Sequence, residues 1–87
     1  MPKLLMFTGL ECPHCHDMFP LVERLEKETK LKVQKIEVWH DEKNAVIFHK
    51  LDNGKCGGVP FFYNEKTKGW ICGAVPYNQF KKWATGK

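Results

Sequence analysis

Apolar and polar positions follow two different periods along the chain, and the periods predict an order of strands and helices. Residues 3–8 form a nearly continuous apolar run, which is typical of a central strand covered on both faces. Behind it, apolar side chains recur every three or four residues to about residue 30, which predicts a helix with one buried stripe. Residues 32–39 alternate apolar and charged side chains, which predicts a strand with one exposed face, close to a sheet edge.

The second half of the chain carries clear helix and turn signals. Asp41 is a good N-cap for a helix over residues 42–52, and Asn53-Gly54 is a common way for such a helix to end. A glycine-rich loop follows, up to Pro60. The second predicted helix therefore ends at about residue 52, and the next element begins after Pro60.

Two short strands and a last helix complete the pattern. Residues 61–63 and 70–72 flank a polar turn and predict a hairpin, and Pro76 suits the start of a helix over residues 77–85. Because a helix separates the first two strands, these should be parallel and joined by a right-handed crossover. We predict one α/β domain over residues 1–87, a four-stranded mixed sheet flanked by three helices in the order βαβ-α-ββ-α.

Composition and charge narrow the choice of partners. The chain has 87 residues and a formal charge of +4, and all but one of its 14 basic residues are lysines, which suit a solvated surface better than phosphate recognition. The apolar run near the start is too short for a secretory signal, and no stretch reaches the length of a membrane span. We therefore expect a cytoplasmic monomer with no nucleic-acid or membrane partner.

The chemistry is concentrated in Cys12-Pro13-His14-Cys15, which lies between the first strand and the first helix. Two intervening residues on the first turn of a helix bring two thiols within disulfide reach. One thiolate then attacks a substrate disulfide and the second cysteine resolves the mixed disulfide. Unsatisfied N–H groups at the helix start favour a thiolate at Cys12, and His14 adds to that stabilisation. Pro13 suits the first helical turn, so the motif predicts a dithiol redox site without a cofactor.

With Val59-Pro60 before the third strand, this arrangement resembles the thioredoxin superfamily, at the size of glutaredoxins and small thioredoxins. The resemblance covers the whole chain. It implies that Cys12 is the exposed nucleophile, that Cys15 is the more buried resolving thiol, and that the two form a disulfide when oxidised. It also implies that Pro60 is a cis-proline beside the sulfurs and that the Val59 backbone pairs with an extended substrate segment. The implied activity is thiol–disulfide exchange with protein disulfides, with recycling by a reductase or by glutathione.

One departure bears on glutathione. Gly73-Ala74 resembles the small pair that follows the fourth strand of glutaredoxins, but the chain continues Val75-Pro76-Tyr77 where those enzymes usually have an acidic pair that holds glutathione. The resemblance therefore favours protein disulfides as substrates, and a glutathione-dependent glutaredoxin is the alternative.

Metal and haem chemistry supply alternatives from another class. Cys12 and Cys15 followed by His16 match the string for c-type haem attachment, although no methionine follows Met18 as a further ligand. Zinc is a second alternative through the same residues, with Cys56 and Cys72 as further ligands, but a second pair of closely spaced ligands is missing. An iron–sulfur cluster that bridges two chains through Cys12 is a further alternative. Taken separately, Cys56 is predicted to be a loop thiol and Cys72 a small core residue.

The aromatic residues are predicted to lie mainly in the core. They include all three tryptophans, which are Trp39, Trp70 and Trp83.

Overall fold

The structure is a computed structural model, and it describes residues 4–86. Its elements follow the predicted order and are β1 (Leu4–Thr8), α1 (Pro13–Thr29), β2 (Val33–Glu37), α2 (Glu42–Asp52), β3 (Phe61–Asn64), β4 (Trp70–Cys72) and α3 (Tyr77–Thr85). The second strand is shorter than its alternating pattern, and residue 3 of the first predicted strand lies outside the described residues. The prediction of a mixed four-stranded sheet with three helices is confirmed.

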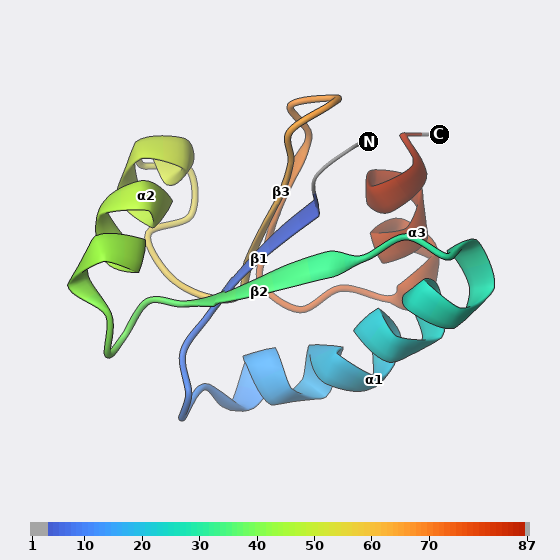
Figure 1. The fold of residues 1–87 in the computed structure, drawn as a ribbon, viewed down its shortest axis with the longest axis horizontal. Helices are drawn as coiled ribbons and strands as arrows, with labels where there is room; N and C mark the ends of the chain where they lie inside the picture. Colours follow the sequence, from blue (N-terminus) through green and yellow to red (C-terminus); the bar gives the residue numbers. More distant parts are fainter. Residues whose placement is uncertain (1–3, 87) are drawn as a thin grey trace.

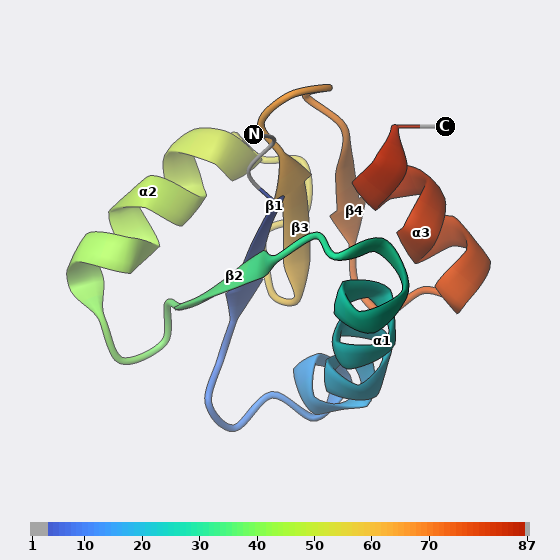
Figure 2. The ribbon, with the colours of Figure 1, turned by 45° about the vertical axis from the view of Figure 1, so that its right-hand side comes forward.

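The sheet has the strand order β2-β1-β3-β4, so β1 lies in its interior. β1 pairs in parallel with β2 and antiparallel with β3, and β3 and β4 form the antiparallel hairpin. Figures 1 and 2 show α1 and α3 on one face of the sheet and α2 on the other. The start of the β1–α1 junction is therefore held firmly, because β1 is hydrogen-bonded to a strand on either side.

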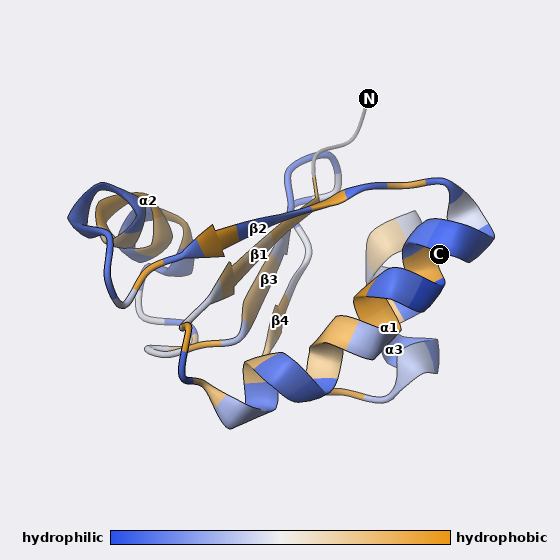
Figure 3. Cartoon of the chain, turned by 60° about the horizontal axis from the view of Figure 1, so that its bottom comes forward, coloured by the Kyte–Doolittle hydropathy of each residue, from blue (hydrophilic) through white to orange (hydrophobic). Residues whose placement is uncertain are grey.

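Side chains of β1 alternate between two cores. Leu4 and Met6 pack on the side of α1 and α3, whereas Leu5 and Phe7 pack on the side of α2. All residues of β1 are buried, as the continuous apolar run predicts. In Figure 3, β1 is hydrophobic along its length, whereas α1 alternates between hydrophobic and hydrophilic residues. The buried stripe of α1 consists of Cys15, Met18, Val22 and Leu25.

The helix ends confirm the signals read from the sequence. Asp41 accepts a hydrogen bond from the Asn44 amide at 3.1 Å and so caps the start of α2. Asn53 adopts a left-handed conformation with φ 47° and ends α2 by donating its N–H to the His49 carbonyl. None of the helices within residues 4–86 is long and apolar enough to cross a membrane.

Two of the three tryptophans do not lie in the core, so that prediction is wrong for them. Trp83 is 8% exposed, but Trp39 and Trp70 are 52% and 42% exposed. Trp39 follows β2 and lies flat over Gly9, where a Cβ would fall 2.2 Å from the indole ring. Trp70 lies on the edge strand β4, where its ring packs against Phe61 of the neighbouring strand. Hydrophobicity alone does not indicate which strand is left at an edge.

A buried asparagine at the end of β3 links the hairpin to α3. The Asn64 amide group donates to the Trp83 carbonyl at 2.9 Å, and its Oδ1 accepts the N–H groups of Lys66 and Thr67 at 2.9 and 3.2 Å. Asn64 is 1% exposed, so these partners are not easily replaced by water. One side chain therefore holds both the hairpin turn and the last turn of α3.

We expect Asn64→Ala to lower the free energy of unfolding by about 1–3 kcal/mol, because it leaves buried backbone groups without partners. Urea denaturation followed by tryptophan fluorescence measures this. Asn78→Ala is the matched control, since Asn78 is exposed on α3, and it should change the free energy by no more than about 0.5 kcal/mol. Equal losses in the two variants would contradict the role given to Asn64.

Candidate dithiol redox site

Cys12 occupies the N-cap of α1. The turn from β1 is closed by a hydrogen bond from the Cys12 amide to the Gly9 carbonyl at 3.0 Å. Cys12 has extended backbone angles, and its Sγ accepts the N–H of Cys15 at 3.2 Å. The sulfur therefore does what a serine or aspartate oxygen does at most helix starts, which is to satisfy a free N–H group. Pro13, the first residue of α1, has no N–H to satisfy.

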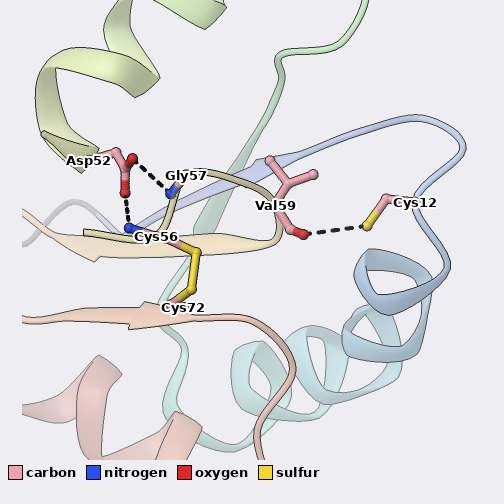
Figure 4. Close-up of a disulfide and its surroundings, with 6 residues drawn as sticks. All are labelled: Cys12, Asp52, Cys56, Gly57, Val59 and Cys72. Carbon is pink, nitrogen blue, oxygen red and sulfur yellow. Dashed lines mark hydrogen bonds between the residues drawn. A yellow bond between two sulfur atoms is a disulfide. The ribbon is translucent and has the colours of Figure 1, made fainter. Parts of the chain in front are cut away.

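The second contact of the Cys12 sulfur comes from the loop before β3. The Cys12 thiol donates to the Val59 carbonyl at 3.8 Å (Figure 4). The Val59–Pro60 peptide bond is cis, as predicted. The structure thus brings together Cys12, Cys15, Val59 and Pro60. The hydrogen bond between Cys12 and Val59 joins residues that are 47 positions apart in the sequence. This grouping lies where β1 ends and β3 begins.

Both thiols are free, and both are buried. Cys15 is 0% exposed, as expected for the more buried thiol, but Cys12 is only 3% exposed, so the expectation of an exposed nucleophile is wrong for this conformation. The reason is the loop before β3, because Val59 packs against the same core cluster that contains Cys12. The Cys12 sulfur is therefore open to solvent only if the Val59 segment moves.

The deep burial of Cys15 affects its protonation. Burial raises the pKa of the Cys15 thiol to about 11, with a further contribution from its hydrogen bond with Cys12. At neutral pH Cys15 is therefore protonated and unreactive as a nucleophile.

The two histidines of the motif region have different surroundings. His14 is exposed, and among residues 4–86 its ring makes no hydrogen bond to the Cys12 sulfur. The His16 ring donates to the Leu10 carbonyl at 2.8 Å and so holds the turn between β1 and α1. The His16 ring is thus hydrogen-bonded to the backbone, whereas the metal and haem alternatives require it as a ligand.

A carboxylate cluster ties this turn to the end of β2. Glu37 accepts the Leu10 amide at 2.9 Å with one oxygen and the His40 amide at 2.7 Å with the other. The His40 ring donates to Glu11 at 2.7 Å, and this hydrogen bond, with the charge of Glu11, raises the pKa of His40. The residue before Cys12 is therefore held from outside the motif, by contacts that the sequence did not suggest.

A second cysteine pair is joined in a disulfide, Cys56–Cys72 (Figure 4). The predictions of a loop thiol and a buried core residue are therefore wrong. Cys72 is exposed on the edge strand β4, where it pairs with Phe61 of β3, and the loop after α2 carries Cys56 back over this strand. The loop path depends on tertiary contacts and has no periodic signal.

Asp52 shapes that loop. Its side chain is buried and accepts the amides of Cys56 and Gly57 at 2.6 and 3.0 Å, as Figure 4 shows. The sequence offered one signal for this role. An acidic residue in the last turn of a helix opposes the helix dipole, so Asp52 needs a compensating partner beyond the helix.

The described part of the chain contains no group of three or more histidine, cysteine or acidic side chains arranged to hold a metal ion. Cys56 and Cys72 are bonded to each other, and this removes them from the zinc alternative in the present state.

The comparisons with known proteins bear on the fold. No protein-family model matches the chain, and no curated protein matches it in sequence. Among solved structures, an uncharacterised thioredoxin-like protein from Clostridium perfringens superimposes with a TM-score of 0.80 and 21% sequence identity, over 99% of this chain and 70% of that one. The chain therefore has a thioredoxin-like fold.

The contact between Glu11 and His40 should make the stability of the fold depend on pH. Because the pKa of His40 is raised in the folded chain, the pair stabilises the fold at low pH and this contribution is lost as the pH rises through that pKa. In Glu11→Gln, the pKa of His40, followed by the NMR shift of its ring protons, should fall towards the ordinary value of 6.5. Glu42→Gln should leave it unchanged. An unchanged His40 titration in Glu11→Gln would show that the contact does not form in solution.

Proposed function

We propose that this chain is a thiol–disulfide oxidoreductase that reduces or exchanges disulfides of other proteins, with Cys12 as nucleophile and Cys15 as resolving thiol. The observation that carries the proposal is the position of the Cys12 sulfur, which caps α1 at 3.2 Å from the Cys15 amide and lies beside Val59–Pro60. The thioredoxin-like fold and a free cysteine pair at the β1–α1 junction fit a redox role.

In the first step, the Cys12 thiolate attacks one sulfur of the substrate disulfide. The new S–S bond forms as the old one breaks, and the other substrate sulfur leaves with the electron pair. The Cys15 amide supports the thiolate, because a hydrogen bond to a charged acceptor is stronger than one to a neutral acceptor. The Val59 amide N–H has no partner among residues 4–86, so it is available to pair with the backbone of a substrate segment.

In the second step, Cys15 loses its proton and attacks the Cys12 sulfur of the mixed disulfide. The second substrate thiolate leaves, and Cys12–Cys15 becomes the disulfide. The high pKa of Cys15 keeps it protonated, so it does not attack the substrate disulfide in place of Cys12. The raised pKa depends partly on Cys12, so forming the mixed disulfide removes one of its causes.

The pair must be returned to the dithiol by a reductase or by glutathione. We propose that the chain works as a cytoplasmic monomer. It needs no bound cofactor, because the two-thiol cycle takes its electrons from the reductase or from glutathione. A glutathione-dependent glutaredoxin differs in one testable respect, since it needs only the first cysteine to reduce a mixed disulfide with glutathione.

Single-cysteine variants test the assignment. Mixed with a protein carrying an accessible disulfide, Cys15→Ser should accumulate a stable mixed disulfide through Cys12, detected on a non-reducing gel and by peptide mass spectrometry. Cys12→Ser should trap none, because Cys15 is buried and protonated at neutral pH. Reduction of the disulfide with dithiothreitol as donor should fall at least about a hundredfold in both variants. Cys12→Ser lacks the nucleophile, and Cys15→Ser lacks the intramolecular attack that releases the substrate, so release there depends on the slower attack of the donor.

The matched control is Cys56→Ser/Cys72→Ser, which keeps the motif intact and should still turn over. Trapping through Cys15, or full activity in Cys12→Ser, would refute the assigned roles. Activity of Cys15→Ser on a glutathione mixed disulfide, with none on protein disulfides in the unmodified chain, would favour the glutaredoxin alternative.

His14 is proposed to tune the couple through its polar ring on the first turn of α1. We expect His14→Val to make the Cys12–Cys15 couple more reducing by about 10–30 mV, because the polar ring stabilises the Cys12 thiolate of the reduced form and has no charge to stabilise in the disulfide. Equilibration with glutathione buffers and thiol trapping measures this. His49→Val, on the exposed side of α2, should leave the potential unchanged. An unchanged potential in His14→Val would remove the role given to His14.

A further inference from the structure

The Cys56–Cys72 disulfide takes no part in the two steps above. We propose that it is a second redox site, opened and closed by small thiols, and that its state sets how closely the Val59 segment covers Cys12. The effect on Cys12 concerns the site of the function proposed above, whereas the opening of the bridge does not depend on that function.

The bridge is open to attack on one side. Cys72 is exposed on the edge strand β4, and Cys56 is half-buried. A thiolate from solvent therefore reaches the Cys72 sulfur first. A bond forms between the small thiol and Cys72, the S–S bond breaks, and Cys56 leaves with the electron pair and takes a proton. A second small thiolate attacks the mixed disulfide and releases Cys72. Two small thiols are oxidised to a disulfide and the bridge is reduced to two thiols.

The bridge is also linked to the dithiol site by a short path. Cys56 lies three residues before Val59, and Cys72 is followed by Gly73, whose amide donates to the Pro60 carbonyl at 2.8 Å. Residues 56–60, this hydrogen bond and the disulfide form a closed ring. Figure 4 shows the disulfide and the Cys56 end of this ring beside Val59, whose carbonyl faces the Cys12 sulfur. The position of the Val59 carbonyl is thus restrained from both ends.

Opening the bridge should loosen this ring without unfolding the loop. Asp52 still holds the Cys56 and Gly57 amides after reduction. Only Gly58 lies between the anchored Gly57 and Val59. A Cβ built on either glycine meets no atom within 4 Å, so the stretch that leads to Val59 has room to move. Once the Val59 carbonyl moves away, the Cys12 thiol loses an acceptor and its cover.

The first experiment tests whether the second couple exists. Cys12→Ser/Cys15→Ser, in which only Cys56 and Cys72 remain, is equilibrated in its native state with a series of reduced and oxidised glutathione or dithiothreitol ratios. Free thiols are then trapped with a maleimide and counted by mass spectrometry. We expect two thiols to appear together at one midpoint, with the slope of a two-electron couple. A pair that stays closed at every ratio, or never closes, overturns the proposal.

The second experiment tests the effect on Cys12. In a Cys15→Ser background, alkylation of Cys12 by iodoacetamide is compared between the closed bridge and the bridge removed by Cys56→Ser/Cys72→Ser. We expect the rate to rise about two- to tenfold on removal, the factor that corresponds to one ordinary hydrogen bond. Cys56→Ser alone and Cys72→Ser alone, with the remaining thiol identified by peptide mapping, should give the same increase. An unchanged rate overturns the link to Cys12.

Two further measurements separate an effect of the bridge on Cys12 from an effect of the substitutions on folding. If the serine variants fold poorly, the same comparison is made on Cys15→Ser with its bridge closed and with its bridge reduced beforehand, which changes no further residue. Asp52→Asn weakens the anchor of the loop while the cysteines remain, and it should also raise the alkylation rate of Cys12. Neither rate requires the chain to act on protein disulfides, so failure of the proposed function and failure of this inference give different results.

Discussion

The candidate site depends on how the N-terminus of α1 is capped. The first amides of a helix have no partner within the helix, and a buried amide without a partner is costly. Here Pro13 has no amide hydrogen to satisfy, and the amide of Cys15 bonds to the sulfur of Cys12. The contact that completes the helix is therefore the same contact that places the proposed nucleophile. This position is kept because β1, which leads into the turn, is buried along its whole length between two layers of helices.

The sulfur of Cys12 is held by two hydrogen bonds that respond in opposite ways to loss of its proton. The amide of Cys15 bonds more strongly to a thiolate, whereas the bond to the Val59 carbonyl exists only while the thiol carries its proton. Moving the Val59 segment therefore removes the contact that favours the thiol and leaves the one that favours the thiolate. Cys15 lies deeper and keeps its proton, since burial raises its pKa to about 11. The geometry thus gives the two cysteines different tasks, although only two residues separate them.

Sequence patterns predicted the parts of the structure that are determined locally. The helices over residues 42–52 and 77–85 have the predicted bounds because Asp41, Asn53 and Pro76 mark their ends. The cis-proline at Pro60 followed from the resemblance to a known fold and is confirmed. The missed features all depend on tertiary position. Trp70 is exposed because β4 is an edge strand, and Cys56 reaches Cys72 because Asp52 folds a loop whose path has no periodic signal.

Val59 connects the two halves of this fold. The sheet separates one core, which contains Cys12 and Cys15, from another, against which Cys56 packs. Val59 packs against both cores, because it lies at the end of the sheet where the separation stops. Its carbonyl accepts the Cys12 thiol on one side, and the ring closed by the disulfide restrains it from the other. A change in the position of this one residue must therefore alter the packing around both cysteine pairs, and no other connection through the sheet is needed to couple them.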